Sequence, residues 1–183
     1  MNLTTTATAA LLLATASWGA TASTVGLTNA GQPASLISLN DLKAVQESKV
    51  TARQAIAAAQ ARSNGGDLVD LKFDASTGTP VYKVRTRRDL TVWDSEIDAR
   101  TGQVIGAGAT TPEAQLGDDD RSELAGLVRV PSASLLQAVV TAENSGGKVV
   151  SAEVEEINGR SAYELIVVKN GSPRRLVYRT HYH

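Results

Sequence analysis

Residues 51–74 read TARQAIAAAQARSNGGDLVDLKFD and contain the helix, turn and strand that decide the fold. Thr51 and Gln54 have the spacing of a capping box, and the alanine-rich stretch that follows is built from strong helix formers. The Asn-Gly-Gly sequence at 64–66 predicts a left-handed helix end. Apolar and charged residues then alternate over 69–74, which predicts a half-buried strand.

The same signals return at an offset of 81 residues: Ser132 aligns with Thr51, and Tyr163 aligns with Tyr82. A second Gly-Gly pair at 146–147 again follows a helical stretch and precedes an alternating strand. Each unit therefore predicts one helix laid across an antiparallel meander of three strands. The expected fold class is α+β, with two tandem helix-on-antiparallel-sheet (α-β-β-β) modules.

Turn residues and periodicity set the other expected elements. A short helix at 39–47, with Ser38 as its N-cap, should precede the first long helix. The expected strands are 69–73, 81–87, 90–98 and a short 103–105 in the first unit, and 150–154, 162–169 and 175–182 in the second.

Residues 1–22 are predicted to be a secretory signal peptide. The apolar stretch at 7–16 is about half as long as the roughly twenty residues of a membrane span. The small residues at 20–22 predict cleavage before Ser23, although the n-region lacks Lys and Arg and a disordered tail is the alternative. Export into a bacterial periplasm or the medium is therefore expected, with no membrane span in the mature chain.

The mature chain divides by composition. Residues 23–36 are expected to be a flexible lead-in, 37–106 the first module and 124–183 the second, divergent one. Residues 107–123 contain Gly, Pro and Thr together with an aspartate triplet, and are expected to be an acidic linker. The triplet lacks the alternating spacing of a calcium-binding loop.

Overall composition excludes several function classes. The chain has 183 residues, with 18 Lys and Arg against 19 Asp and Glu, so it lacks the basic excess of a nucleic-acid-binding domain. It contains no cysteine, which excludes disulfides and thiol catalysis. Its two histidines, His181 and His183, lie in the last three residues and are weak metal-ligand candidates, because a site usually needs three or four ligands. No cofactor is expected.

The order of elements and the segment IDARTGQV at 97–104 resemble the PepSY family, which occurs in propeptides of thermolysin-type metallopeptidases. The most recognisable part of the resemblance is the turn formed by Asp98, Ala99, Thr101 and Gly102. The second unit lacks this turn. The resemblance implies an exported module that binds or inhibits a peptidase or docks on another protein, and that carries no catalytic residues of its own.

Basic residues at the expected hairpin ends are the candidate partner-binding residues: Arg85, Arg87, Arg88, Arg174 and Arg175. They could contact an acidic protein partner or the chain's own acidic linker, or they could form a solvated rim of the sheet. We therefore expect a non-catalytic binding module that regulates a peptidase or docks on an envelope protein. A periplasmic accessory protein that senses a small ligand or a metal is the alternative.

Overall fold

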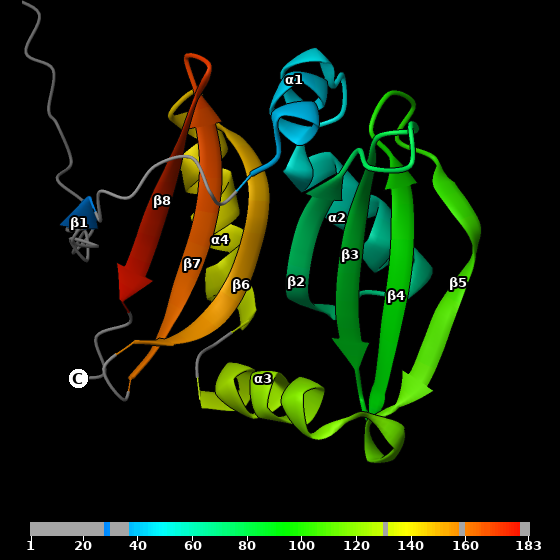
Figure 1. The fold of residues 1–183 in the computed structure, drawn as a ribbon. Coiled ribbons are helices and arrows are strands. Elements are labelled where there is room, and N and C mark those ends of the chain that lie inside the picture. Colours follow the sequence, from blue (N-terminus) through cyan, green and yellow to red (C-terminus); the bar gives the residue numbers. More distant parts are fainter. Residues whose placement is uncertain (1–27, 30–36, 130–131, 158–159, 180–183) are drawn as a thin grey trace, which may run out of the picture.

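The computed structural model describes residues 28–29, 37–129, 132–157 and 160–179. Its centre is an eight-stranded antiparallel sheet with the strand order β1-β8-β7-β6-β2-β3-β4-β5 (Figure 1). The strands are β1 (Thr28–Asn29), β2 (Asp67–Asp74), β3 (Val81–Arg88), β4 (Thr91–Asp98), β5 (Val104–Pro112), β6 (Lys148–Ile157), β7 (Arg160–Lys169) and β8 (Ser172–Arg179). The helices are α1 (Leu39–Glu47), α2 (Ala52–Arg62), η1 (Glu113–Gln115), α3 (Asp118–Arg129) and α4 (Ser132–Asn144). The α+β fold class is confirmed.

The helix α2 begins as its sequence predicts. The Thr51 hydroxyl accepts a hydrogen bond from the Gln54 backbone at 3.2 Å, and the Gln54 side chain accepts one from the Thr51 backbone at 2.9 Å. The helix buries a face of small residues and Ile56 against the sheet. It ends at Ser63, after which Asn64 and Gly65 take positive φ angles. The capping box and the left-handed helix end are both present.

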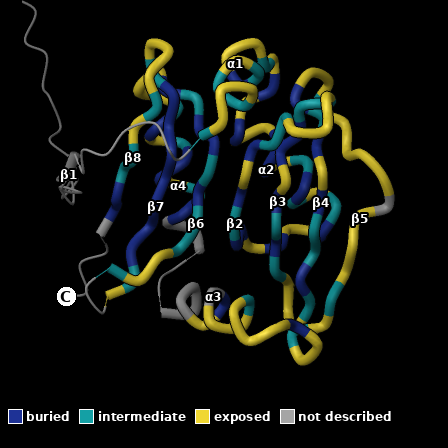
Figure 2. The backbone as a smooth tube through the Cα atoms, in the orientation of Figure 1, coloured by how far each residue is buried: buried dark blue, intermediate teal, exposed yellow. Residues whose placement is uncertain are grey.

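One hydrophobic core joins the two halves of the chain. Ile56 of α2 and Leu135 and Val139 of α4 are fully buried in a single cluster, on the face of the sheet that α2 and α4 cover (Figure 1). Figure 2 shows the buried residues concentrated along the inner strands, whereas the edge strand β5 is largely exposed. The halves therefore share one core.

The sheet is also continuous across the halves. Strands β2 and β6 pair directly, with Leu71 opposite Ala152 and Lys72 opposite Ser151. The register shifts on both outer sides of this seam, between Leu68 and Asp70 in the β2–β3 pairing and between Val149 and Ser151 in the β6–β7 pairing. The seam is short, and each of its two strands has an irregularity in its pairing with the next strand. Two separate modules are not what the structure contains.

Two polar contacts further connect the halves. The ammonium group of Lys148 donates to the carbonyls of Val45, Gln46 and Ser48 at 2.8–2.9 Å, at the C-terminal end of α1. The carboxylate of Glu143 accepts from the backbone of Ala52 at 2.8 Å, at the N-terminal end of α2. Both charges therefore suit the helix end that they contact.

The expected linker at 107–123 is folded instead. Its residues belong to β5, η1 and the start of α3, and β5 runs well past the short strand expected at 103–105. Gly106 and Gly108 take positive φ angles, where β5 shifts register against β4. The glycines therefore mark an edge-strand irregularity, and the aspartate triplet forms the acidic first turn of a helix, where its charge is favourable.

The expected lead-in at 23–36 differs from the structure at one point, since Thr28 and Asn29 pair with Val177 and Leu176 of β8. The predicted signal peptide and the rest of the lead-in lie outside the described residues. No helix among the described residues is long and apolar enough to cross a membrane.

Candidate protein-binding face

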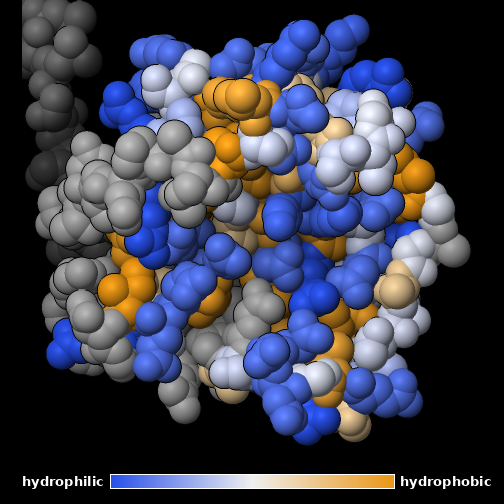
Figure 3. All heavy atoms as spheres, viewed as in Figure 1, coloured by the Kyte–Doolittle hydropathy of each residue, from blue (hydrophilic) through white to orange (hydrophobic). Residues whose placement is uncertain are grey.

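The side of the sheet opposite α2 and α4 is called here the open face. Among the described residues, α3 packs on it through Leu124, in one cluster with Val69 and Val92, and the start of α1 lines a groove on it. In Figure 1 α3 lies at the lower end of the sheet, and Figure 3 shows that hydrophilic residues occupy much of the described surface above it. Among the described residues, helices cover only part of this face, and the remaining part is a candidate for contact with another molecule.

Charged residues cross the open face in a row set by the strand register. Arg85 of β3 lies between Asp94 of β4 and Asp70 of β2. The β2–β6 pairing continues the row to Glu153, which lies opposite Glu164 of β7. Four carboxylates and one guanidinium therefore lie side by side on the sheet, and they interact electrostatically.

Arg85 holds the acidic end of this row together. Its Nε lies 2.9 Å from Asp94 Oδ1 and 3.6 Å from Asp70 Oδ2. Its Nη1 donates to Asp120 Oδ1 of α3 at 2.7 Å. Arg85 is thus shared by three carboxylates and neutralises only part of their charge. Asp70 is the farthest of the three from the Arg85 guanidinium.

Burial raises the pKa of the Asp70 carboxyl to about 6, against the opposing attraction of Arg85, and the nearby charges of Asp94 and Asp120 raise it further. Burial also raises the pKa of Glu153, with Glu155 and Glu164 adding to the effect. Ionised carboxylates at these two positions are therefore under-compensated.

A groove of about 410 Å³ opens on this face beside the β2–β6 seam, and we call it the seam groove. Its charged lining residues are Asp41, Asp70, Lys72, Glu153 and Glu164. Asp41 is already engaged, because it accepts from the Ala75 backbone at 2.7 Å, and Glu164 pairs with Arg175. The excess of negative charge in the groove therefore comes from Asp70 and Glu153.

The predicted basic residues of the first half bind the chain itself. Arg87 pairs with Glu113 of η1, and Arg85 with Asp120 of α3. Arg88 donates to the Asn64 carbonyl at 2.6 Å. Arg85 and Arg87 therefore contact the chain's own acidic segment, one of the interpretations that the sequence left open, and contact with a partner protein stays a prediction.

The predicted basic residues of the second half lie elsewhere. Arg175 pairs with Glu164 on the open face, whereas Arg174 is exposed on the same strand, β8. Strands β8 and β3 are four positions apart in the sheet, so about 19 Å separates them. The five arginines therefore do not form one basic patch.

The turn that carries the family resemblance has a structural role. Asp98 Oδ1 accepts from the backbone of Arg100 at 2.7 Å and of Thr101 at 3.0 Å, and these bonds lower the pKa of the Asp98 carboxyl. Ala99 is fully buried, and its carbonyl accepts from the Ser48 hydroxyl at 2.9 Å. Gly102 has a φ of 76°. The motif fixes the β4–β5 turn against the loop between α1 and α2.

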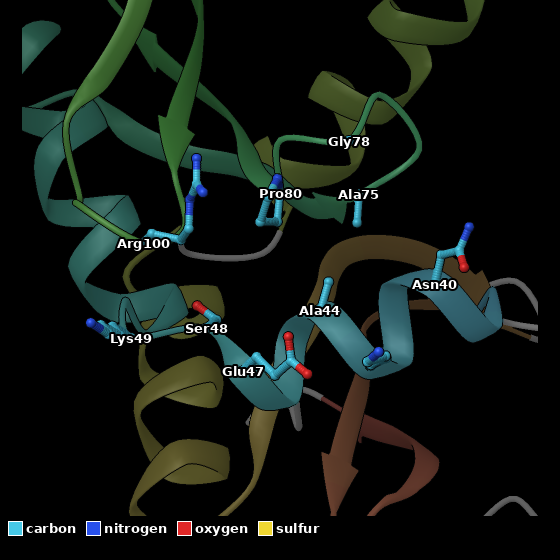
Figure 4. A pocket seen from close by; sticks show the side chains of 10 residues that line it. Asn40, Ala44, Glu47, Ser48, Lys49, Ala75, Gly78, Pro80 and Arg100 are labelled. Carbon is cyan, nitrogen blue, oxygen red and sulfur yellow. The ribbon is translucent and has the colours of Figure 1, made fainter.

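A second groove lies between α1 and the β2–β3 turn, next to Arg100 (Figure 4). It contains Lys43, Lys49 and Arg100, but the side chains of Lys49 and Arg100 extend in different directions, so the cations do not converge. No group of three or more metal-ligating side chains occurs in the described part of the chain. His181 and His183 lie outside it.

The acidic row was not predicted from the sequence. The alternating patterns at 69–74 and 150–154 place Asp70 and Glu153 on the polar sides of their strands, but strand periodicity does not say which strands pair. The direct contact of β2 with β6, across the expected module boundary, is what brings these two acids together. At the offset of 81 residues Asp70 aligns with Ser151 and Glu153 aligns with Lys72, so the repeat gave no signal for this contact.

Replacing Asp70 with asparagine should stabilise the protein at pH 8 and have little effect at pH 4. The folded pKa of about 6 lies above the ordinary 3.8, so this carboxyl lowers stability progressively as the pH rises from about 3.8 to 6. The full cost is present at pH 8, whereas at pH 4 most of it has not yet arisen. The expected gain in the free energy of unfolding at pH 8 is about 1–2 kcal/mol. Arg85 is not left unpaired by the substitution, because Asp94 and Asp120 remain its partners.

Urea unfolding of Asp70→Asn and wild type at pH 8 and pH 4 measures the change in stability at each pH. Groups that titrate alike in both proteins do not contribute to the difference between them. Asp67→Asn is the matched control, because Asp67 is an exposed acid on the same strand. A loss of stability at pH 8 would show that the Asp70–Arg85 attraction outweighs burial.

Comparison with known proteins bears on the first half of the chain. The family described as "Peptidase propeptide and YPEB domain", or PepSY, matches residues 49–107. No curated protein matches the chain. A crystal structure described as a candidate lipoprotein from Clostridium difficile 630 is 21% identical over 67% of this chain and 81% of its own, with a TM-score of 0.39. The matched residues run from the capping box of α2 to the first residues of β5 and include the Asp98 turn. Residues 49–107, about a third of the chain, are therefore similar to the PepSY family.

Proposed function

We propose that this chain is a non-catalytic binding module that docks on a peptidase, or on another envelope protein, through the open face of its sheet. The description of the matched family, a peptidase propeptide domain, supports a peptidase as the partner. The segment from α4 to β8 repeats the order of α2 to β4 and is proposed as a second, divergent copy. The seam groove then lies where the two copies meet.

The observation that carries this proposal is the under-compensated negative charge of Asp70 and Glu153 in the seam groove. Asp70 and Glu153 face the groove with pKa values raised by burial, so a cation placed between them would favour their ionised forms. A lysine or arginine side chain of a partner protein has the required charge and the reach to enter a groove from a surface. The partner is therefore expected to present basic residues to this face.

Inhibition of a purified thermolysin-type metallopeptidase tests the proposal. Wild-type protein should bind and inhibit the peptidase, and Glu153→Lys should weaken inhibition at least tenfold, because it reverses the charge inside the groove. Glu156→Lys is the matched control, since Glu156 is an exposed acid on the same strand that does not line the groove. Absence of both binding and inhibition, or equal loss in the two variants, would contradict docking on a peptidase through this groove.

We also propose that the protein is exported and acts in the periplasm or outside the cell. The short apolar stretch at 7–16 and the small residues before Ser23 support removal of a signal peptide.

A further inference from the structure

The helix α3 occupies a mixed apolar and basic part of the open face, which we call the α3 seat and define by Val69, Val92, Arg85 and Arg87. Val69 and Val92 are fully buried, and the side chains that cover them are Leu116 and Leu124. Without this cover, two valines at the α3 end of the sheet face would be exposed to water.

The charges of the seat match the segment that covers it. Asp120 of α3 binds Arg85, and Glu113 of η1 binds Arg87. Along the chain, Glu113, Leu116, Asp120 and Leu124 follow one another at intervals of three or four residues, so acidic and apolar groups alternate on the side that meets the sheet. The seat thus recognises an acidic amphipathic segment.

Among the side chains that the structure describes, α3 buries fewer than α2. Four side chains of α2 are buried, whereas Leu124 is the buried residue among the α3 side chains that the structure describes. Arg85 keeps Asp94 and Asp70 nearby if Asp120 leaves, so release of α3 does not strand a buried charge. Segments with few buried apolar contacts open at a lower free energy than the whole domain.

We propose that the α3 seat is an interaction surface for an acidic amphipathic segment of the partner protein, and that α3 is the chain's own occupant of it. The inference rests on the proposed function, because it assigns a second contact of the same partner on the same face. The partner's segment replaces α3, taking the carboxylate positions at Arg85 and Arg87 and covering Val69 and Val92. The seam groove accepts basic residues of the partner at the same time.

Thiol labelling tests whether α3 leaves its seat, because the chain contains no cysteine. Val92→Cys and Ile97→Cys both place one thiol at a fully buried position of β4, the first under α3 and the second in the core on the opposite face. We expect Val92→Cys to react with a maleimide at least tenfold faster. Asp120→Asn should accelerate labelling at position 92 further and leave labelling at position 97 unchanged.

A peptide with the sequence of residues 113–129 tests which chemistry the seat recognises. Asp120→Asn protein should bind this peptide at least fivefold more tightly than wild type, because the internal competitor is weakened. A peptide with asparagine or glutamine at its acidic positions should bind at least fivefold less tightly. Arg87→Gln in the Asp120→Asn protein should weaken binding of the acidic peptide only.

Equal labelling rates at positions 92 and 97, or peptide binding that ignores the acidic positions, would overturn the inference. So would concentration-dependent dimerisation of the Asp120→Asn protein that accounts for its labelling, since the occupant would then be a second copy. The proposed function has a separate readout: peptidase inhibition that Glu153→Lys abolishes would stand even if α3 never leaves its seat.

Discussion

Replacing Leu165 with alanine should lower the stability of the N-terminal half together with that of the C-terminal half. Leu165 is fully buried at the centre of β7, and it belongs to the cluster that also contains Ile56 of α2. A buried leucine truncated to alanine costs about 3 kcal/mol. Because the sheet and the core are continuous, this loss should appear in one cooperative transition of the whole chain.

Trp93 makes the result measurable. It lies on β4, in the first half of the chain. The sequence has two tryptophans, so the experiment uses a protein that carries Trp18→Phe and keeps Trp93. Its fluorescence should report a lower denaturant midpoint with an unchanged slope in Leu165→Ala, although the substitution is in the other half. Leu39→Ala, at a position that is 84% exposed, should shift the midpoint little. An unchanged Trp93 transition in Leu165→Ala would instead indicate two independent modules.

Replacing Lys148 with methionine should destabilise the protein by about 2 kcal/mol, because three backbone carbonyls at the end of α1 lose a charged donor. Burial lowers the pKa of the Lys148 ammonium group, and its removal recovers part of that desolvation cost. Hydrogen exchange should show the largest increase in α1, whose C-terminal end Lys148 contacts.

Lys169→Met is the matched control. Lys169 is also a strand lysine that donates to a backbone carbonyl, but it makes one bond, to Ser145 at 2.6 Å, at an exposed position. Its loss should cost well under 1 kcal/mol. Equal destabilisation by the two substitutions would mean that the contact of Lys148 with α1 contributes nothing beyond that of an exposed lysine.

Local signals in the sequence were sufficient for most individual elements. The expected helix at 39–47 is α1, and Thr51 and Gln54 form the predicted capping box. Asp98 caps the backbone of its own turn, as a turn aspartate is expected to do. These features depend on contacts within a few residues, so the pattern of residue types contains the needed information.

The segment at 107–123 shows where local signals fail. Glycine, threonine and aspartate fit a solvated linker, and they fit an irregular edge strand followed by an acidic helix start equally well. Contacts with residues distant in the sequence decide between the two: β5 pairs with β4, and Leu116 and Leu124 cover Val69. Burial of these apolar groups favours the folded alternative.

The sequence by itself determined the helix caps, the strand periodicity and the family resemblance of residues 49–107, because each rests on neighbours along the chain. Only the tertiary structure decided that β2 pairs with β6, and this pairing merges two expected modules into one sheet and places Asp70 beside Glu153. It also decided that Arg85 and Arg87 bind the chain's own acidic segment. Strand pairing and ion pairing depend on distances in space, which a one-dimensional pattern of residue types does not specify.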